Sequence, residues 1–238
     1  MESHILLAEW NNVVMANFRV PKELLLPYVP HGTQLDFFEG ETYLSLMAFM
    51  FLNTRIRNFS VPFHTDFEEV NLRFYVKSMD RGNWNNGVVF IKEIVPKPVI
   101  TFVANNFFGE KYSTMKMKHS HSDTGEFLQV GYEWNFQNKW NRLSVKAAKK
   151  SLPLLPSSLE EFIADRHWAF TKYNGNKTYK YEVQRPRWKI LPVISHLIDC
   201  DFGALCGEEF SFLNNARPKS VLIAKGSEIR IFRKGFLE

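Results

Sequence analysis

The stretch F-E-E-V-N-L-R-F-Y-V, at residues 67–76, decides the fold because its side chains sort into two faces. Successive side chains of a β-strand point to opposite sides of the sheet. One face of this segment is apolar, and the other carries an acid, an amide, a base and a phenol, namely Glu69, Asn71, Arg73 and Tyr75. The pattern predicts a strand whose polar face is either solvated or lines a cleft or a barrel.

The neighbouring sequence favours a buried setting for this polar face. The run T-Y-L-S-L-M-A-F-M-F, at residues 42–51, is apolar on both faces, which is typical of a buried strand. Buried charges need partners. Glu69 and Arg73 share a face but lie too far apart along a strand to be adjacent, so each is expected to pair with another strand or with a ligand. The alternative is an internal ion-pair network with no catalytic role.

Short apolar segments separated by polar turns make up the rest of the chain. N-G-N-K, at residues 174–177, is the clearest hairpin turn because Asn-Gly accepts the positive φ that tight turns require. Proline and serine signals predict short helices at residues 21–30 and 157–165, and another is expected at 192–198. C-terminal strands are expected near residues 209–213, 220–224 and 228–233. The pattern indicates a single domain over residues 1–238, mainly antiparallel β, closed or partly closed, with a few short helices at the ends.

Composition and charge limit the kinds of binding partner and the cellular compartment that the sequence predicts. The chain has 238 residues, and its 30 basic residues are spread among 25 acidic ones, so no nucleic-acid partner is expected. No apolar run approaches the length of a membrane span and the N-terminus lacks the features of a signal peptide, so no membrane partner is expected. Cys200 and Cys206 are too few for a disulfide framework. They predict free thiols in the cytoplasm.

Familiar catalytic motifs are missing from the sequence. It contains no P-loop, no G-x-G-x-x-G after a strand, no H-E-x-x-H and no G-x-S-x-G. The pair His119 and His121 could share one face of a strand, but its surroundings of Ser, Asp, Thr and Gly indicate exposed turn residues rather than a metal site. No cofactor and no metal are therefore expected.

Four segments together resemble a known family. They are residues 27–49 (P-Y-V-P-H-G-T-Q-L-D-F-F-E-G-E-T-Y-L-S-L-M-A-F), 62–76 (P-F-H-T-D-F-E-E-V-N-L-R-F-Y-V), 81–97 (R-G-N-W-N-N-G-V-V-F-I-K-E-I-V-P-K) and 104–112 (A-N-N-F-F-G-E-K-Y). The chain resembles the YqjF-like family of uncharacterised proteins over most of residues 10–190. That family is similar in turn to acetoacetate decarboxylase, which implies a cone-shaped antiparallel β-barrel around a central cavity.

The same resemblance suggests roles for particular residues. The decarboxylase forms a Schiff base between a lysine and a β-keto acid. By the order of the segments, its active-site glutamate corresponds to Glu69 and its reactive lysine to Lys111 or a neighbour. Here Glu110 and Tyr112 flank Lys111, where the decarboxylase has a proline and a second lysine, and a carboxylate beside a lysine favours the charged ammonium.

The sequence therefore predicts a barrel that binds a small anionic or carbonyl-bearing organic molecule. Glu69 and Lys111 are the candidate catalytic residues of a Schiff-base lyase or decarboxylase. The expected ligand-binding residues are Asn71, Arg73 and Tyr75, with Arg73 holding a carboxylate through its planar fork. A non-catalytic binding or sensor module and a structural or interaction protein remain the alternatives. A homo-oligomer is compatible with either.

Overall fold

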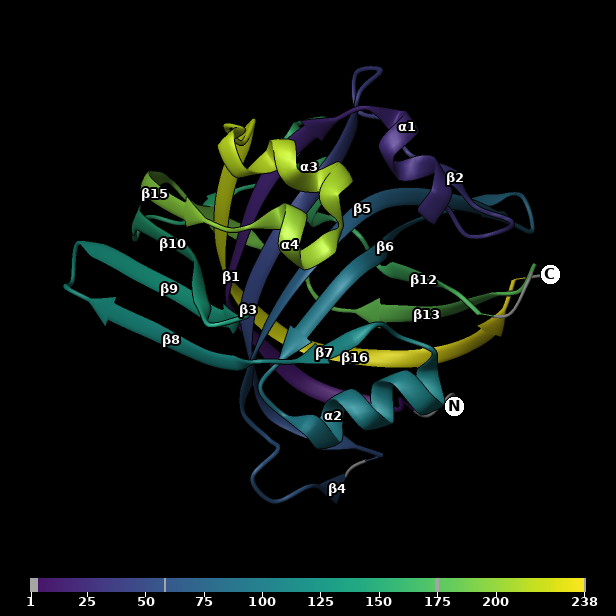
Figure 1. Cartoon of the computed structure of the whole chain (residues 1–238), viewed down its shortest axis with the longest axis horizontal. Coiled ribbons are helices and arrows are strands. Elements are labelled where there is room, and N and C mark those ends of the chain that lie inside the picture. Colours follow the sequence, from purple (N-terminus) through teal and green to yellow (C-terminus); the bar gives the residue numbers. More distant parts are fainter. Residues whose placement is uncertain (1–3, 58, 174–175, 238) are drawn as a thin grey trace.

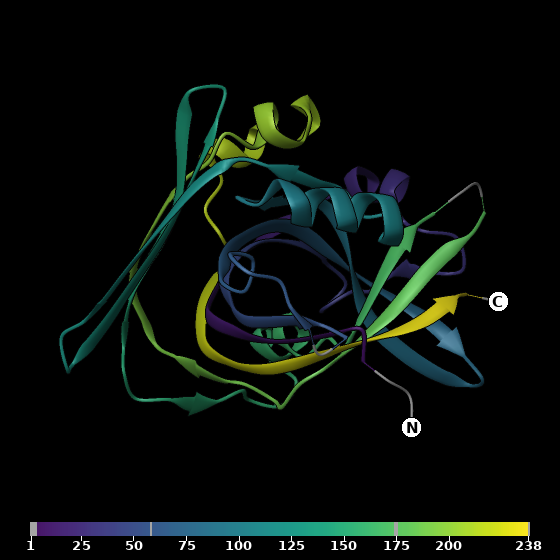
Figure 2. The same ribbon diagram turned by 90° about the horizontal axis from the view of Figure 1, so that it is seen from below.

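Long strands form the body of the molecule, as the alternating sequence predicts. The computed structural model describes residues 4–57, 59–173 and 176–237. Its main sheet contains, in order of pairing, β1, β3, β5, β6, β12, β13 and β16. Their bounds are Leu6–Val20, Thr42–Ile56, Phe67–Asp80, Asn83–Val95, Trp168–Lys172, Thr178–Gln184 and Ser220–Phe236. Because β16 also pairs with β1, the succession of pairings returns to its first strand and the sheet curls into a cone (Figure 1, Figure 2).

Short strands extend this sheet, and a second sheet lies beside it. The short strands are β2 (Gln34–Leu35), β4 (Phe59–Ser60), β7 (Tyr112–Thr114), β11 (Leu152–Pro153) and β14 (Lys189–Leu191). The second sheet runs in the order β15 (Val193–Asp199), β10 (Lys139–Ala148), β9 (Phe127–Phe136) and β8 (Lys116–Asp123). Figure 2 shows it standing to one side of the cone. The molecule is thus mainly β, which confirms the predicted fold class.

The two faces of β5 belong to two different hydrophobic cores. Val70 and Phe74 pack in the core that also contains residues of β9, such as Trp134. Phe67 and Tyr75 belong to the other core, inside the cone. The strand is therefore buried on both sides, and its polar row points into the cone.

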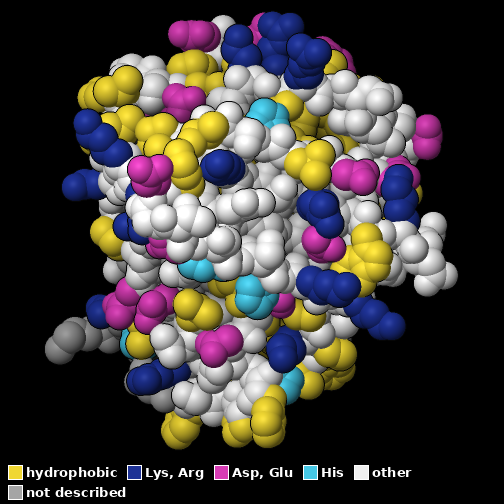
Figure 3. Space-filling view, turned by 90° about the vertical axis from the view of Figure 1, so that its left-hand side faces the viewer, with side chains coloured by type: hydrophobic (Ala, Val, Ile, Leu, Met, Phe, Trp, Pro, Cys, Tyr) yellow, Lys and Arg dark blue, Asp and Glu magenta, His cyan; other side chains and the backbone are white. Residues whose placement is uncertain are grey.

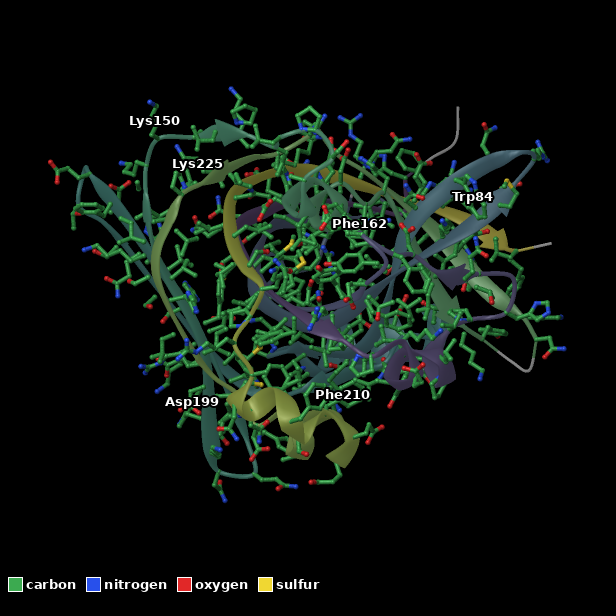
Figure 4. All side chains as sticks on the ribbon, turned by 90° about the horizontal axis from the view of Figure 1, so that it is seen from above. Trp84, Lys150, Phe162, Asp199, Phe210 and Lys225 are labelled. Carbon is green, nitrogen blue, oxygen red and sulfur yellow. The ribbon has the colours of Figure 1, made fainter. Side chains whose placement is uncertain are left out.

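The helices are short and lie around the strands. They are α1 (Lys22–Leu25), η1 (Leu26–Tyr28), α2 (Pro98–Val103), the π-helical η2 (Ala104–Phe108), α3 (Leu159–Ala164), α4 (Phe202–Cys206) and η3 (Glu208–Asn215). Phe162 of α3 reaches the interior, where its ring centroid is 5.2 Å from that of Tyr75 (Figure 4). No helix among the described residues is long and apolar enough to cross a membrane.

Two of the predicted elements are wrong. Residues 192–198 were expected to be helical, but Val193–Asp199 form β15, because pairing with β10 supplies backbone hydrogen bonds that local propensity does not anticipate. The expected strand at 209–213 lies within the 3₁₀-helix η3. Residues three apart share one face of a 3₁₀-helix, so Phe210 and Leu213 are both buried there.

The predicted hairpin near residue 174 has its two strands in place. β12 and β13 pair antiparallel, with Phe170 opposite Lys180. Residues 174–175 of the expected turn lie outside the described part of the chain. The predicted helices at 21–30 and 157–165 are present as α1 with η1 and as α3, where Ser158 accepts a hydrogen bond from the Glu161 amide as the N-cap.

Candidate functional site

The polar row of β5 is buried inside the cone. Glu69, Asn71, Arg73 and Tyr75 are only 3%, 2%, 5% and 1% exposed. Such groups are stable in an interior only if other polar groups or a ligand satisfy them. The chemistry of these four side chains therefore depends on the groups that they contact.

Neighbouring strands complete the polar row near Glu69. Glu93 of β6 lies directly opposite Asn71, and Tyr112 of β7 lies opposite Glu93. The Asn71 side-chain amide donates to Oε1 of Glu69 at 2.9 Å, and the Tyr112 hydroxyl donates to Oε2 at 2.8 Å. Both oxygens of Glu69 are thus held in a fixed orientation.

Glu110 adds a third carboxyl group that the sequence analysis did not select. Thr171 donates its hydroxyl to the two Glu110 oxygens at 3.0 and 3.1 Å, and Tyr181 also hydrogen-bonds this carboxyl. Gly109, with φ of 69°, forms the turn that leads into Glu110. Because β7 begins only at Tyr112, strand alternation does not cover Glu110, and the sequence carries no direct signal that this carboxyl faces inward.

Burial changes the protonation of these carboxyls. Loss of hydration raises the pKa of Glu69 to about 7, against the hydrogen bonds from Asn71 and Tyr112. Burial likewise raises the pKa of Glu110 to about 7, and it raises the pKa of Glu93 well above its usual value, assisted by the two neighbouring carboxyls. The cluster therefore holds and exchanges protons near neutral pH.

A cavity of about 210 Å³ lies against this cluster. Most of its lining is apolar, and its roof is formed by α2 and by the segment that carries Val61 and His64. Apart from His64, its polar lining consists of Thr54, Glu69, Glu110, Tyr112 and Tyr181. A pocket of this kind, apolar with a few convergent polar groups, is the usual form of a small-molecule site.

A second cavity, of about 50 Å³, adjoins the first at Glu69, Tyr112 and Tyr181. These three side chains line both cavities. Arginines and a further carboxyl complete the polar lining of the smaller one, namely Arg73, Arg166, Arg185 and Glu93. The site thus has an apolar compartment, a wall of acids and phenols, and a basic compartment.

The arginines of the smaller cavity differ in their partners. Arg166 donates to Oδ2 of Asp36 at 2.6 Å. Arg73 reaches only the Ile163 carbonyl at 3.4 Å and the Met15 sulfur at 3.5 Å, and its buried Nε has no partner among the described residues. Buried guanidinium groups without a carboxylate are a recurrent feature of anion sites.

Arg185 resembles Arg73 in this respect. Its Nη2 donates to the Ala164 carbonyl, its guanidinium lies 3.8 Å from the ring centroid of Trp188, and its buried Nε also lacks a partner among the described residues. Burial and the nearby Arg73 charge lower the pKa of Arg185 to about 10. The two cations therefore repel each other inside the protein.

Of the five predicted site residues, only Glu69 and Arg73 line a cavity, whereas Asn71, Tyr75 and Lys111 line neither. Lys111 is exposed, and its Nζ lies 5.9 Å from the ring centroid of Tyr28. It lines neither cavity, whereas Glu69 and Arg73 line the smaller one together. Lys111 lies just before β7, between Glu110 and Tyr112, which both line the larger cavity. Tyr75 bonds Ser45 through its hydroxyl and also lines neither cavity.

The remaining histidine pair lies away from both cavities. Nδ1 of His119 lies 2.6 Å from Oε1 of Glu68, and both His119 and His121 are exposed. Within the described ranges, no three His, Cys, Asp or Glu side chains are arranged to hold a metal ion.

Comparisons with known proteins give a family and a fold. A family model described as an uncharacterized conserved protein matches residues 7–228. The chain is 25% identical to the uncharacterized protein YqjF of Bacillus subtilis over 185 residues, which are 77% of this chain and 74% of YqjF.

Three solved structures share its fold at low sequence identity. Acetoacetate decarboxylase from Legionella pneumophila has a TM-score of 0.64 at 12% identity, over 98% of this chain and 87% of that one. An acetoacetate decarboxylase-like enzyme from Sphingomonas wittichii has a TM-score of 0.65 at 12% identity, over 100% and 94%. The enduracididine biosynthesis enzyme MppR, complexed with pyruvate, has a TM-score of 0.59 at 13% identity, over 100% and 91%.

Proposed function

The chain belongs to DUF2071, the family of uncharacterized conserved proteins whose model matches residues 7–228, and it has an acetoacetate decarboxylase-like fold. We propose that it binds a small oxo acid across its two cavities. The apolar part of the ligand occupies the larger cavity, and its carboxylate lies against Arg73 and Arg185 in the smaller one. The observation that carries this proposal is the shared wall of Glu69, Tyr112 and Tyr181 between an apolar and a basic compartment. MppR, which has the same fold, is described in complex with pyruvate, itself an oxo acid.

The charges of the smaller cavity support a carboxylate there. Asp36 pairs with Arg166, and no carboxylate oxygen among the described residues lies within 4.0 Å of a nitrogen of Arg73 or Arg185. A bound carboxylate would screen the repulsion between these two guanidiniums and accept their free Nε–H groups. The cavity of about 50 Å³ has room for one such group.

We propose that Glu69 exchanges a proton with the bound ligand. Its pKa of about 7 leaves both protonation states populated at neutral pH, which suits a general acid–base group. Ionised Glu69 would take a proton from the carbon next to the ligand's carbonyl group, leaving an enolate, and the protonated carboxyl would return it. Tyr112 and Tyr181 stay neutral donors because burial raises the pKa of both well above their usual value.

Binding should require both the ligand's carboxylate and Arg73. In calorimetric titrations we expect 2-oxo acids to bind and their uncharged amides not to bind. Arg73→Met should weaken acid binding about 10- to 100-fold, since a hydrogen bond to a charged group contributes roughly 1.5–3 kcal/mol. Arg19→Met, at an exposed arginine paired with Glu41, is the matched control and should bind as the wild type does.

The stability of the Arg73→Met variant makes this test specific. Replacing a buried cation by an apolar side chain of similar length does not destabilise an unliganded site that holds repelling cations. We expect its melting temperature without ligand to equal or exceed that of the wild type. Equal affinity for acids and amides, or unchanged affinity in Arg73→Met, would contradict the proposed carboxylate site.

Proton exchange should depend on Glu69 and not on Lys111. We expect the protein to exchange the proton beside the carbonyl of 2-oxobutanoate for deuterium in D₂O, as followed by NMR. Glu69→Gln should slow this exchange by roughly 10²- to 10⁴-fold, the usual range for a general base, with binding retained. Lys111→Met should leave the rate unchanged, because Lys111 lies outside both cavities.

Borohydride separates this chemistry from the Schiff-base alternative. If Lys111 forms an iminium with the ligand, reduction leaves a covalent adduct on that lysine, and Lys111→Met abolishes both adduct and exchange. Binding with no exchange in any variant would instead indicate a sensor module.

Assembly and location are further parts of the proposal. We propose a single domain over residues 1–238, located in the cytoplasm, where Cys200 and Cys206 remain the free thiols seen in the structure. A homo-oligomer is compatible with this arrangement.

A further inference from the structure

Large apolar side chains are exposed together at one tip of the molecule. At this tip α2 lies next to the hairpin of β3 and β4 (Figure 1). The exposed side chains form what we call the tip patch: Ile56, Phe59, Val61, Phe63, Val99 and Phe102, with exposed fractions between 40% and 89%. Figure 3 shows hydrophobic side chains standing out at this lower tip, with basic ones nearby. Contiguous exposed apolar patches of this kind mark interaction surfaces.

The tip patch continues into the larger cavity. Ile56, Val61 and Val99 belong to the patch and also line that cavity. The patch therefore surrounds the apolar end of the cavity, whose other end carries Glu69 and Glu110. A partner that covers the patch also covers the entrance to the cavity.

Basic side chains flank the tip patch, while the acidic side chains nearest to it along the hairpin, Glu9 and Asp66, accept hydrogen bonds from Asn53 at its base. Arg55 and Arg57 belong to the same hairpin, are exposed, and form no ion pair with any described residue. Lys97 precedes α2. The sequence has no Asp or Glu at residues 53–65 or at residues 96–109.

We propose that the tip patch docks on an anionic lipid surface, with Phe59 and Phe63 among the lipid chains and Arg55 and Arg57 at the phosphates. Aromatic side chains beside arginines are the usual composition of segments that bind at the membrane surface. Phe63 is 89% exposed, and its φ of 65° is one that few non-glycine residues adopt.

A second copy of the chain fits the tip patch less well than a lipid surface does. A symmetric dimer would apply the same patch to itself and bring the unpaired arginines of both copies together. Anionic head groups neutralise these charges instead. Docking of this kind needs no membrane-spanning segment, but it revises the sequence-based expectation that the protein has no membrane partner.

Flotation of the full chain with lipid vesicles tests the proposal. We expect binding to vesicles of phosphatidylcholine that contain about 30 mol% phosphatidylglycerol, and much weaker binding to phosphatidylcholine alone. Phe59→Ser with Phe63→Ser should reduce the partition coefficient at least tenfold. Arg55→Gln with Arg57→Gln should reduce it roughly fivefold for each charge, only on the anionic vesicles.

A control at the opposite end of the molecule completes the test. In Figure 1 the segment of α4 and η3 lies at the opposite end of the molecule from β4. Phe212 of η3 is 46% exposed, so Phe212→Ser should float as the wild type does. Circular dichroism and oxo-acid binding show whether each variant is folded. If folded wild-type protein does not bind the anionic vesicles, or if Phe212→Ser loses as much binding as the tip variants, the proposal is overturned. It is also overturned if the tip variants only change the oligomeric state in sedimentation velocity.

Discussion

Asp36→Asn is expected to lower the free energy of unfolding by about 3 kcal/mol, because it removes the countercharge of a buried arginine. The Asp36 carboxylate accepts from Arg166 at 2.6 Å, and the two side chains are only 11% and 3% exposed. Lys77 lies 3.5 Å from the other oxygen. Asn has the same shape, so the change isolates the lost charge.

The position of Arg166 makes this loss large. Burial lowers its pKa and the Asp36 charge opposes that shift, so without Asp36 the guanidinium stays buried and unpaired. Arg73 is close enough to add repulsion. Urea titrations of the wild type and Asp36→Asn measure the difference. The exposed pair of Glu41 and Arg19 provides the control, and Glu41→Gln should change stability by less than about 1 kcal/mol. Equal effects of both variants would mean that Arg166 finds another partner.

The same ion pair connects stability to the proposed site. Arg166 follows α3, whose Phe162 packs against Tyr75, and it lines the smaller cavity with Arg73. Asp36 therefore balances one of the three arginine charges of that cavity. Oxo-acid binding by folded Asp36→Asn should be retained, because the variant leaves the cavity more positive.

The inward direction of the polar row could be predicted from the sequence because side-chain alternation along a strand depends only on local residues. Alternation along one strand, together with apolar neighbours, was enough to place Glu69, Asn71 and Arg73 inside the cone. The partners of the row come from distant parts of the chain, and Glu110, Arg166 and Arg185 could not be selected without the pairings. The acidic and basic side chains of the site thus come together only because strands distant in sequence pair with one another.

The order of segments does not resolve adjacent residues at Lys111. The aligned blocks indicated this part of the chain, but they did not decide which of two adjacent residues faces inward. In the structure Glu110 and Lys111 precede β7, and the carboxyl of Glu110, not the amine of Lys111, lines the larger cavity. The strand predicted at 209–213 is wrong because hydrophobic content alone does not distinguish a strand from a helix. Phe210 and Leu213 are both buried, and their spacing of three residues places them on one face of a 3₁₀-helix.

Stability is expected to fall as the pH rises from about 5 to 8, because of the buried carboxyls. Folding raises the pKa of Glu69 and Glu110 from 4.5 to about 7, so in this interval the folded state binds more protons than the unfolded state. Stability then decreases with pH, by roughly 3 kcal/mol for one carboxyl shifted this far. Carboxyls with lowered pKa, such as Asp80, act in the opposite direction but titrate below this window.

Glu93→Gln should flatten this dependence. The pKa of Glu93 is raised well above its usual value, and both neighbouring carboxyls repel its charge. One of its oxygens is buried and accepts no hydrogen bond from any described residue. A neutral isostere removes the ionisation that destabilises the folded state, so the variant should exceed the wild type in stability at pH 8 and differ little at pH 5. Glu133→Gln, at a half-exposed glutamate paired with Arg142, is the control and should keep the wild-type slope.

Urea unfolding at several pH values separates a functional from a structural role for this cluster. If Glu93→Gln is more stable at pH 8 while its oxo-acid binding or proton exchange is impaired, the carboxyls are kept at a cost to stability because the ligand needs them. If its stability drops at every pH with no change in slope, Glu93 is ionised in the fold and acts as a countercharge for the arginines of the smaller cavity. In that case Glu93 itself would neutralise the arginines of the smaller cavity, and no ligand carboxylate would be needed there. The measurement therefore tests the proposed carboxylate site as well as the carboxyl cluster.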